Sequence, residues 1–139
     1  MSDDTLRSIE MTRIGKGHFE ATNVRGGTLS IGGSEDAFSP VELLLAAIAG
    51  CSALDVDAIT SKRAEPTRFE LQMRGDKIRD EQGNRLTNVV LRFDVEFGDD
   101  EGGRAAAAVL ERSVRQSHDR LCTVSRSVEV GTPIDVQVG

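Results

Sequence analysis

The segment from Ser39 to Ile59 constrains the fold more than any other part of this 139-residue chain. It predicts a helix whose apolar side chains cover nearly every angle around the axis, and a helix of this kind must be buried on all sides. These side chains are Val41, Leu43, Leu44, Leu45, Ala46, Ala47, Ile48, Ala49, Ala53, Leu54, Val56, Ala58 and Ile59. A chain of this length forms a single domain, 1–139, too small to cover such a helix alone. We therefore expect a homodimer in which a second subunit supplies the missing surface.

The start of this helix has a strong local signature. Ser39 is a preferred N-cap, Pro40 suits the first helical position, and Glu42 stands three residues after the cap, which together form a capping box. The helix is predicted to run from Pro40 to about Lys62 or Arg63, because Pro66 holds its predecessor in extended geometry.

Alternating apolar residues predict strands on both sides of this helix. The first 33 residues contain short alternations broken by glycine pairs, which predict two or three strands. Residues 69–73 and 91–97 predict an antiparallel hairpin with a turn at 80–84. A second helix is expected from Gly102 to about Arg120, then a short helix or turn after Cys122, then a last strand within 128–138. The fold class is α+β, with antiparallel strands around a long central helix.

Charge and hydropathy exclude several classes of partner. A net charge of -6 and a pI near 4.9 argue against a nucleic-acid partner, which usually requires a basic surface. The longest apolar run, Leu43 to Cys51, has nine residues, so we expect no membrane span. The acidic N-terminus, Met1 to Asp4, lacks a secretion signal, so we expect a cytoplasmic protein.

The two cysteines are the main candidates for chemistry. Cys51 lies in the middle of the apolar helix, where burial raises a thiol pKa, so a reactive Cys51 requires a nearby cation. Cys122 precedes a short predicted helix, whose free backbone N–H groups favour a thiolate. A separation of 71 residues excludes a CxxC motif and a zinc-finger pair. In a reducing compartment, two interpretations remain open: a transient catalytic disulfide, or two buried thiols that act as small hydrophobic residues.

Two segments carry a resemblance to a known family. The first, Ser39-Pro-Val-Glu-Leu-Leu-Leu-Ala-Ala-Ile-Ala-Gly-Cys51-Ser-Ala-Leu-Asp-Val, resembles the signature helix of the OsmC / organic hydroperoxide resistance (Ohr) family. The second, Leu121-Cys122-Thr-Val-Ser125, resembles the second-cysteine motif of that family. The order of predicted elements also resembles the OsmC-like fold, an intertwined homodimer, over nearly the whole chain.

The resemblance implies a thiol-dependent peroxidase of oxidative-stress defence that needs no metal and no organic cofactor. Cys51 would attack the peroxide and become a sulfenic acid, Cys122 would condense with it to a disulfide, and an external dithiol would reduce that disulfide. Disulfide closure needs Cα atoms within about 7 Å, so the turn at Cys122 must pack on the middle of the central helix.

The resemblance also implies an arginine that stabilises the thiolate and a glutamate that orients the arginine. Arg25 is the best positional match and Arg13 the second, although either also fits a solvated hairpin charge. The Ohr subgroup has its acid directly after the proline, where this chain has Val41, and Glu42 follows one residue later. On a regular helix Glu42 would lie about 13.5 Å along the axis from Cys51 and on the opposite face. We therefore favour a helix-capping role for Glu42 over a catalytic one.

The same residues bear on other functions. The helix residues Leu44, Leu45, Ile48 and Leu54 would line the pocket for an organic tail, or form ordinary core. The alternative to a peroxidase is a non-catalytic protein that has this fold and binds a small lipophilic ligand. His18 and His118, the only histidines, stand in no metal-binding pattern, and a Cys-His hydrolase would need a histidine beside Cys51.

Overall fold

The computed structural model describes residues 5–139, which divide into two compact units, one ending at Leu44 and the other comprising Leu45–Gly139. The acidic N-terminus, on which the expected cytoplasmic location rests, lies outside the described residues. Antiparallel strands and helices occur in one chain, so the predicted α+β class is confirmed. The assignment of 1–139 to a single domain stays a prediction.

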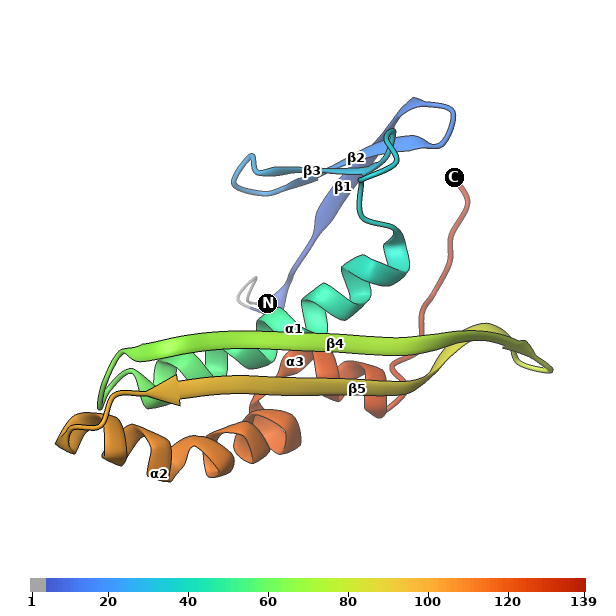
Figure 1. Cartoon of the computed structure of the whole chain (residues 1–139). Helices are drawn as coiled ribbons and strands as arrows, with labels where there is room; N and C mark the ends of the chain where they lie inside the picture. Colours follow the sequence, from blue (N-terminus) through green and yellow to red (C-terminus); the bar gives the residue numbers. More distant parts are fainter. Residues whose placement is uncertain (1–4) are drawn as a thin grey trace. The chain divides into compact units, whose positions relative to one another are not determined.

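The first unit contains a three-stranded antiparallel sheet, in the order β1 (Ile9–Gly15), β2 (His18–Asn23) and β3 (Thr28–Gly32) (Figure 1). The turn from β2 to β3 is closed by Asn23, whose Oδ1 accepts the backbone N–H groups of Arg25 and Gly27 at 2.9 and 3.0 Å. Gly26 has a φ of 89°, a conformation that favours glycine. The predicted N-terminal strands are therefore confirmed, and there are three.

Helix α1 (Pro40–Thr60) begins where the sequence predicts. The Ser39 N–H donates to Glu42 Oε1 at 2.8 Å, and the Glu42 N–H donates to Ser39 Oγ at 3.1 Å, so the capping box is formed in full. The helix ends two residues before Lys62, because the chain turns at residues 61–63 before β4.

Strands β4 (Pro66–Asp80) and β5 (Gly83–Phe97) form the long antiparallel hairpin of the second unit (Figure 1). The register pairs Phe69 with Val95 and Leu71 with Phe93, so the apolar alternations of the two strands face each other. The hairpin reverses between Asp80 and Gly83, and Gly83 has a φ of 101°. The predicted hairpin and its turn are confirmed.

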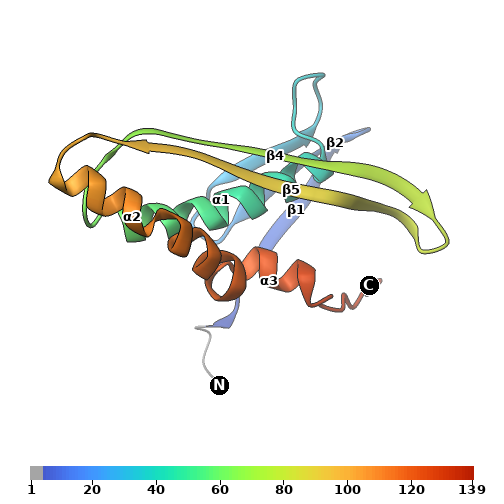
Figure 2. The ribbon, with the colours of Figure 1, turned by 60° about the horizontal axis from the view of Figure 1, so that its bottom comes forward.

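The remaining helices follow the hairpin. Helix α2 (Glu101–Gln116) is capped by Asp100, whose side chain accepts the Gly103 N–H at 2.6 Å, and it lies beside β5 at the open end of the hairpin (Figure 2). The chain then widens into a π-helical segment, η2 (Ser117–Leu121), and continues through Cys122 into α3 (Thr123–Glu129). The second helix was predicted to continue to Arg120; its last turn is π-helical instead.

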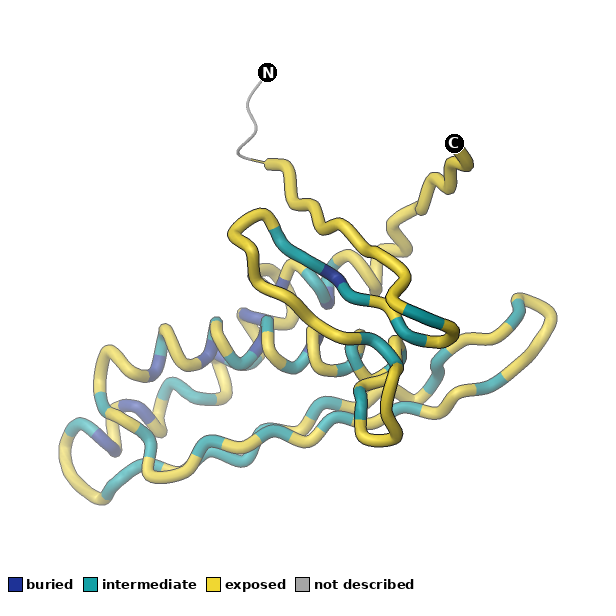
Figure 3. The backbone as a smooth tube through the Cα atoms, turned by 90° about the horizontal axis from the view of Figure 1, so that it is seen from above, coloured by how far each residue is buried: buried dark blue, intermediate teal, exposed yellow. Residues whose placement is uncertain are grey.

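The predicted last strand is wrong. Val128 lies in α3, and residues 132–139 form neither helix nor strand. Figure 3 shows this end of the chain exposed, and Ile134, Val136 and Val138 have exposed fractions of 81–96%. An alternating pattern forms a strand only where another strand edge is free to pair with it, and no described part of this chain pairs with residues 132–139.

Helix α1 buries one narrow stripe within its own chain, consisting of Ile48, Ser52, Val56 and Thr60. These residues are four apart and share one face. Leu44, which begins the same row, is 39% exposed, and Leu54 on another face is 74% exposed. One chain therefore does not bury the helix on all sides, as its sequence requires.

The length of α1 corrects one argument made from the sequence. The helix has 21 residues, so by length and composition it could cross a membrane, although its longest uninterrupted apolar run has nine. Core helices of soluble proteins meet the same criterion, but only 22% of its most apolar 18-residue window is buried. The absence of a membrane span stays a prediction.

Candidate functional site

Cys122 is fixed at the start of α3 and packed against α1. It has extended backbone angles, φ -74° and ψ 100°, and its sulfur caps the helix by accepting the Ser125 N–H at 3.4 Å. The same sulfur lies 3.2 Å from the Ser125 hydroxyl and 4.0 Å from the Ile48 carbonyl oxygen. Because Ile48 lies about one turn before Cys51, this contact holds the second cysteine beside the first.

Cys51 projects from α1 toward the start of α3. The Cys122 side chain and the backbone of Thr123 and Val124 lie close enough to Cys51 to shift the pKa of its thiol. Both cysteines are free thiols; Cys122 is fully buried and Cys51 is partly exposed. One cysteine of the pair is thus partly exposed, while the other is buried.

The surroundings of Cys51 in the second unit favour its protonated form. Burial raises the pKa of the Cys51 thiol above its ordinary value, and the hydrogen bond and charge of Cys122 raise it further. The backbone groups of Val124 and Thr123 act in the opposite direction and lower this pKa, but the net direction is upward. A thiol in this state is a poor nucleophile at neutral pH unless a cation is added.

Two buried serine hydroxyls and one carboxylate form a hydrogen-bonded chain between α1 and η2. Ser117 Oγ donates to Asp55 Oδ2 at 2.8 Å and lies 3.0 Å from Ser52 Oγ. Ser52 and Asp55 belong to α1, and Ser117 is the first residue of η2. The sequence interpretation missed all three residues. The available signal was the pair of polar residues at positions 52 and 55, which share one face of an otherwise apolar helix.

The structure brings together two of the predicted site residues, Cys51 and Cys122, in the second unit. Arg25 lies in the exposed turn between β2 and β3, Arg13 lies in β1, and Glu42 caps α1; these three belong to the first unit. Their predicted roles beside Cys51 stay predictions, whereas the capping role of Glu42 is confirmed.

The apolar residues proposed to line a substrate pocket differ in exposure. Ile48 is buried at 8%, Leu45 is partly exposed, and Leu44 and Leu54 are exposed. Within the single chain, Ile48 is therefore a core residue, and the others remain available to a ligand or to another subunit.

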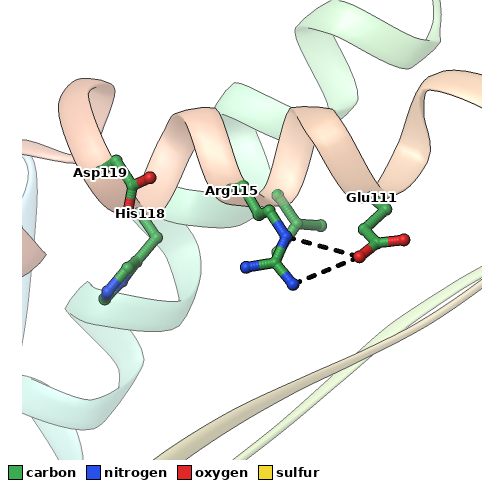
Figure 4. A pocket seen from close by; sticks show the side chains of 5 residues that line it. Glu111, Arg115, His118 and Asp119 are labelled. Atoms are coloured by element: carbon green, nitrogen blue, oxygen red, sulfur yellow. Dashed lines mark hydrogen bonds and ion pairs between the residues drawn. The ribbon is translucent and has the colours of Figure 1, made fainter.

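A pocket of about 300 Å³ lies elsewhere, on α2 and η2 (Figure 4). Its lining consists of Glu111, Val114, Arg115, His118 and Asp119. Arg115 forms an ion pair with Glu111 at 3.3 Å, and His118 Nε2 lies 3.2 Å from Glu129 Oε1, so both side chains have partners within the chain. Across residues 5–139, no three His, Cys, Asp or Glu side chains gather as a metal ion would require.

The fold and the site define a class: an α+β protein in which a partly exposed cysteine on a central helix faces a buried cysteine from a later helix. Residues 33–137 match the family model described as OsmC-like protein. The chain belongs to the OsmC-like protein family, and the resemblance found in its two cysteine motifs is confirmed.

Relatives and solved structures agree with this assignment. An uncharacterized protein of Mycobacterium tuberculosis is 26% identical over 137 residues, which cover 96% of both chains. The crystal structure of a hypothetical protein from Aquifex aeolicus has a TM-score of 0.73 at 23% identity, covering 91% of this chain and 89% of that one. An organic hydroperoxide resistance protein OsmC from Legionella pneumophila has a TM-score of 0.61 at 18% identity, covering 90% and 91%. The two structures share the fold with this chain.

Proposed function

We propose that this protein is a cysteine-based hydroperoxide reductase that works through a disulfide between Cys51 and Cys122. The Cys51 thiolate attacks the terminal peroxide oxygen, the O–O bond breaks, and Cys51 becomes a sulfenic acid. The leaving alkoxide takes up the proton that the Cys51 thiol released on ionisation and departs as an alcohol. The Cys122 thiol then attacks the oxidised sulfur, an S–S bond forms, and the oxygen leaves as water. An external dithiol reduces the disulfide and completes the cycle.

The observation that carries this proposal is the asymmetric pairing of the two sulfurs. Cys122, 71 residues after Cys51 in the chain, is buried within reach of it, and only Cys51 is partly exposed. A peroxidatic sulfur must meet its substrate, and a resolving sulfur must wait nearby without being oxidised first. Two buried thiols serving only as small hydrophobic residues would need neither feature.

The raised pKa of Cys51 gives the proposal a further requirement. Because the protonated thiol is favoured by burial, a cation must lower this pKa before Cys51 reacts at neutral pH. We assign this role to Arg25, with Arg13 as the second candidate; an orienting role for Glu42 is the alternative to its role as a helix cap. The arginine belongs to the same chain or to the second subunit of a dimer.

The family and the names of two structural neighbours also support a peroxidase function. The structural neighbour from Legionella pneumophila bears the name of an organic hydroperoxide resistance protein, and so does a neighbour from Bacillus subtilis with a TM-score of 0.54. The proposal includes a cytoplasmic homodimer in oxidative-stress defence. The apolar faces of α1 left exposed by one chain support the homodimer.

The test is a thiol count after one equivalent of organic hydroperoxide is added to the reduced protein. We expect both free thiols to disappear and a mass loss of about 2 Da, from an intramolecular disulfide. A protein that only binds a lipophilic ligand would keep both thiols. If both free thiols persist after the peroxide has been added, the proposed peroxidase activity is rejected. The charged pocket on α2 gives no support to lipophilic binding, because four of its five lining residues are ionisable.

A further inference from the structure

The buried hydroxyl chain has a defined direction. The Ser117 hydroxyl has one proton, which it donates to the Asp55 carboxylate, so the 3.0 Å contact with Ser52 must use the Ser52 proton. Ser52 therefore donates to Ser117, and Ser117 donates to Asp55. Ser52 is 3% exposed and Ser117 is fully buried, so water does not compete at these two hydroxyls.

Ser117 is also bonded to Cys122 through its backbone. The Ser117 carbonyl accepts the Cys122 N–H at 2.8 Å, the bond that closes the π-helical segment. Cys122 follows in extended geometry and begins α3. π-Helical turns are rare and occur frequently at functional sites. Ser117 thus binds α1 with its side chain and Cys122 with its carbonyl.

Ser117 is therefore bonded both to the helix that contains Cys51 and to Cys122. Ser52 is the direct neighbour of Cys51 on α1, and its hydroxyl reaches Ser117, whose carbonyl holds Cys122. If the Ser117 hydroxyl is removed, the π-helical segment keeps its backbone bonds but loses its polar attachment to α1. Cys122 then keeps its contact with Ile48, but the segment before it is no longer hydrogen-bonded to α1, so its position relative to Cys51 is less tightly fixed.

We propose that Ser117 is a positioning residue which, through Ser52 and Asp55, sets the rate at which Cys122 closes onto oxidised Cys51. The inference rests on the proposed function for its biological meaning, but it concerns the closing step alone. In that step the S–S bond forms, the S–O bond of the sulfenic acid breaks, and the thiol proton leaves with the oxygen as water.

Ser113 provides a matched control. It is also a buried serine, 2% exposed, and lies one turn before Ser117 in α2. Its hydroxyl donates to the Val109 carbonyl of its own helix at 2.7 Å and makes no bond to α1. Ser113→Ala therefore removes a buried hydroxyl, as Ser117→Ala does, without cutting the link between the cysteine-bearing elements.

The experiment compares single turnovers of reduced natural protein, Ser117→Ala and Ser113→Ala, with disulfide and sulfenic acid followed by rapid quench and mass spectrometry. For Ser117→Ala we expect Cys51 to be oxidised at the natural rate and disulfide closure to slow by about tenfold or more. We expect more sulfinic acid at excess peroxide, because a sulfenic acid that waits longer is oxidised further. Ser113→Ala should close at the natural rate.

A second oxidant separates this inference from the proposed function. Diamide adds to one thiolate through an S–N bond, the second thiol displaces it, and diamide leaves as a hydrazine, so closure is measured without peroxide chemistry. Asp55→Asn keeps an acceptor oxygen for Ser117 and should close faster than Ser117→Ala with either oxidant. If the natural protein closes with diamide but ignores peroxide, the proposed function fails alone. If Ser117→Ala closes as fast as the natural protein with diamide, the positioning role is rejected.

Discussion

The sulfur of Cys122 lies 4.0 Å from the carbonyl oxygen of Ile48, about one helical turn before Cys51. The resolving sulfur is thus packed on α1 before any oxidation occurs, and closure requires a local adjustment instead of a large rearrangement. Disulfide geometry needs Cα atoms within about 7 Å, and a preformed contact of this kind removes most of the entropy cost of closure.

The two cysteines should fail in different ways when replaced. Cys51→Ser should abolish peroxide turnover, because no other described cysteine is exposed to the substrate. Cys122→Ser should still react once and accumulate the Cys51 sulfenic acid, which dimedone traps as a covalent adduct visible by mass spectrometry. Full activity in both variants would reject the assigned roles.

The pH dependence of Cys51 alkylation should shift when Cys122 is replaced. The pKa of Cys51 is raised by burial and also by the hydrogen bond and charge of Cys122. Cys122→Ser removes the charge and leaves a hydroxyl that can donate to the Cys51 thiolate, so the pKa should fall. At a fixed pH below the midpoint, Cys51 should therefore react faster with iodoacetamide in the variant.

The measurement is the alkylation rate of Cys51 as a function of pH, with the modified peptide identified by mass spectrometry. The unfolded protein in urea is the control, because there the two proteins should titrate alike. A midpoint that is unchanged or higher in Cys122→Ser would contradict the coupling between the two sulfurs.

Arg25 and Arg13 can be separated by the same titration. If Arg25 supplies the cation, Arg25→Ala should raise the Cys51 midpoint and slow peroxide reduction at neutral pH, because the thiolate fraction falls. Arg13→Ala should leave both unchanged. The reverse pattern would assign the role to Arg13. If neither variant has an effect, the proposed role of an arginine is rejected.

Glu42 offers a test that distinguishes a helix cap from an orienting acid. Its Oε1 accepts the Ser39 N–H, and glutamine at this position of a capping box makes the same bond. Glu42→Gln should therefore keep both stability and activity, whereas Ser39→Ala should lower the free energy of unfolding by about 1 kcal/mol. Chemical denaturation and peroxide turnover measure the two effects. Lost activity with unchanged stability in Glu42→Gln would show that the charge itself is needed.

Local sequence signals predicted the elements whose cause is local. The capping box fixed the start of α1 because Ser39 and Glu42 bond each other, and the antiparallel pairing of β4 with β5 followed from the alternations around Phe69 and Leu91. The paired cysteine motifs identified the family because the residues around Cys51 and Cys122 form recognisable patterns.

Features set by distant contacts were missed or mispredicted. The π-helical start at Ser117 coincides with a hydrogen bond to Asp55, 62 positions earlier, which no local pattern reveals. The alternation through Ile134 and Val138 predicted a strand, but a strand needs a neighbour, and none pairs with this segment in the described chain. The apolar circumference of α1 predicts burial on all sides, which one chain does not provide, so the predicted second subunit stays a prediction.

The exposed part of α1 leads to a prediction about assembly. Leu54 is 74% exposed in the single chain, although it belongs to a helix that is apolar around its circumference. If a second subunit covers this face, Leu54→Glu would place a charge in the interface, where its desolvation is costly. We expect the natural protein to have a dimeric mass by light scattering at micromolar concentration, and Leu54→Glu to shift it toward the monomer.

Ala105→Glu is the matched control, because it adds the same charge at an exposed position of α2. It should leave the dimer intact, and circular dichroism should show that both variants keep their helices. Because Leu54 has few contacts to lose within its own chain, dissociation of Leu54→Glu alone would locate the interface on α1. A natural protein with a monomeric mass would instead mean that the apolar faces of this helix remain uncovered, and the homodimer would be rejected.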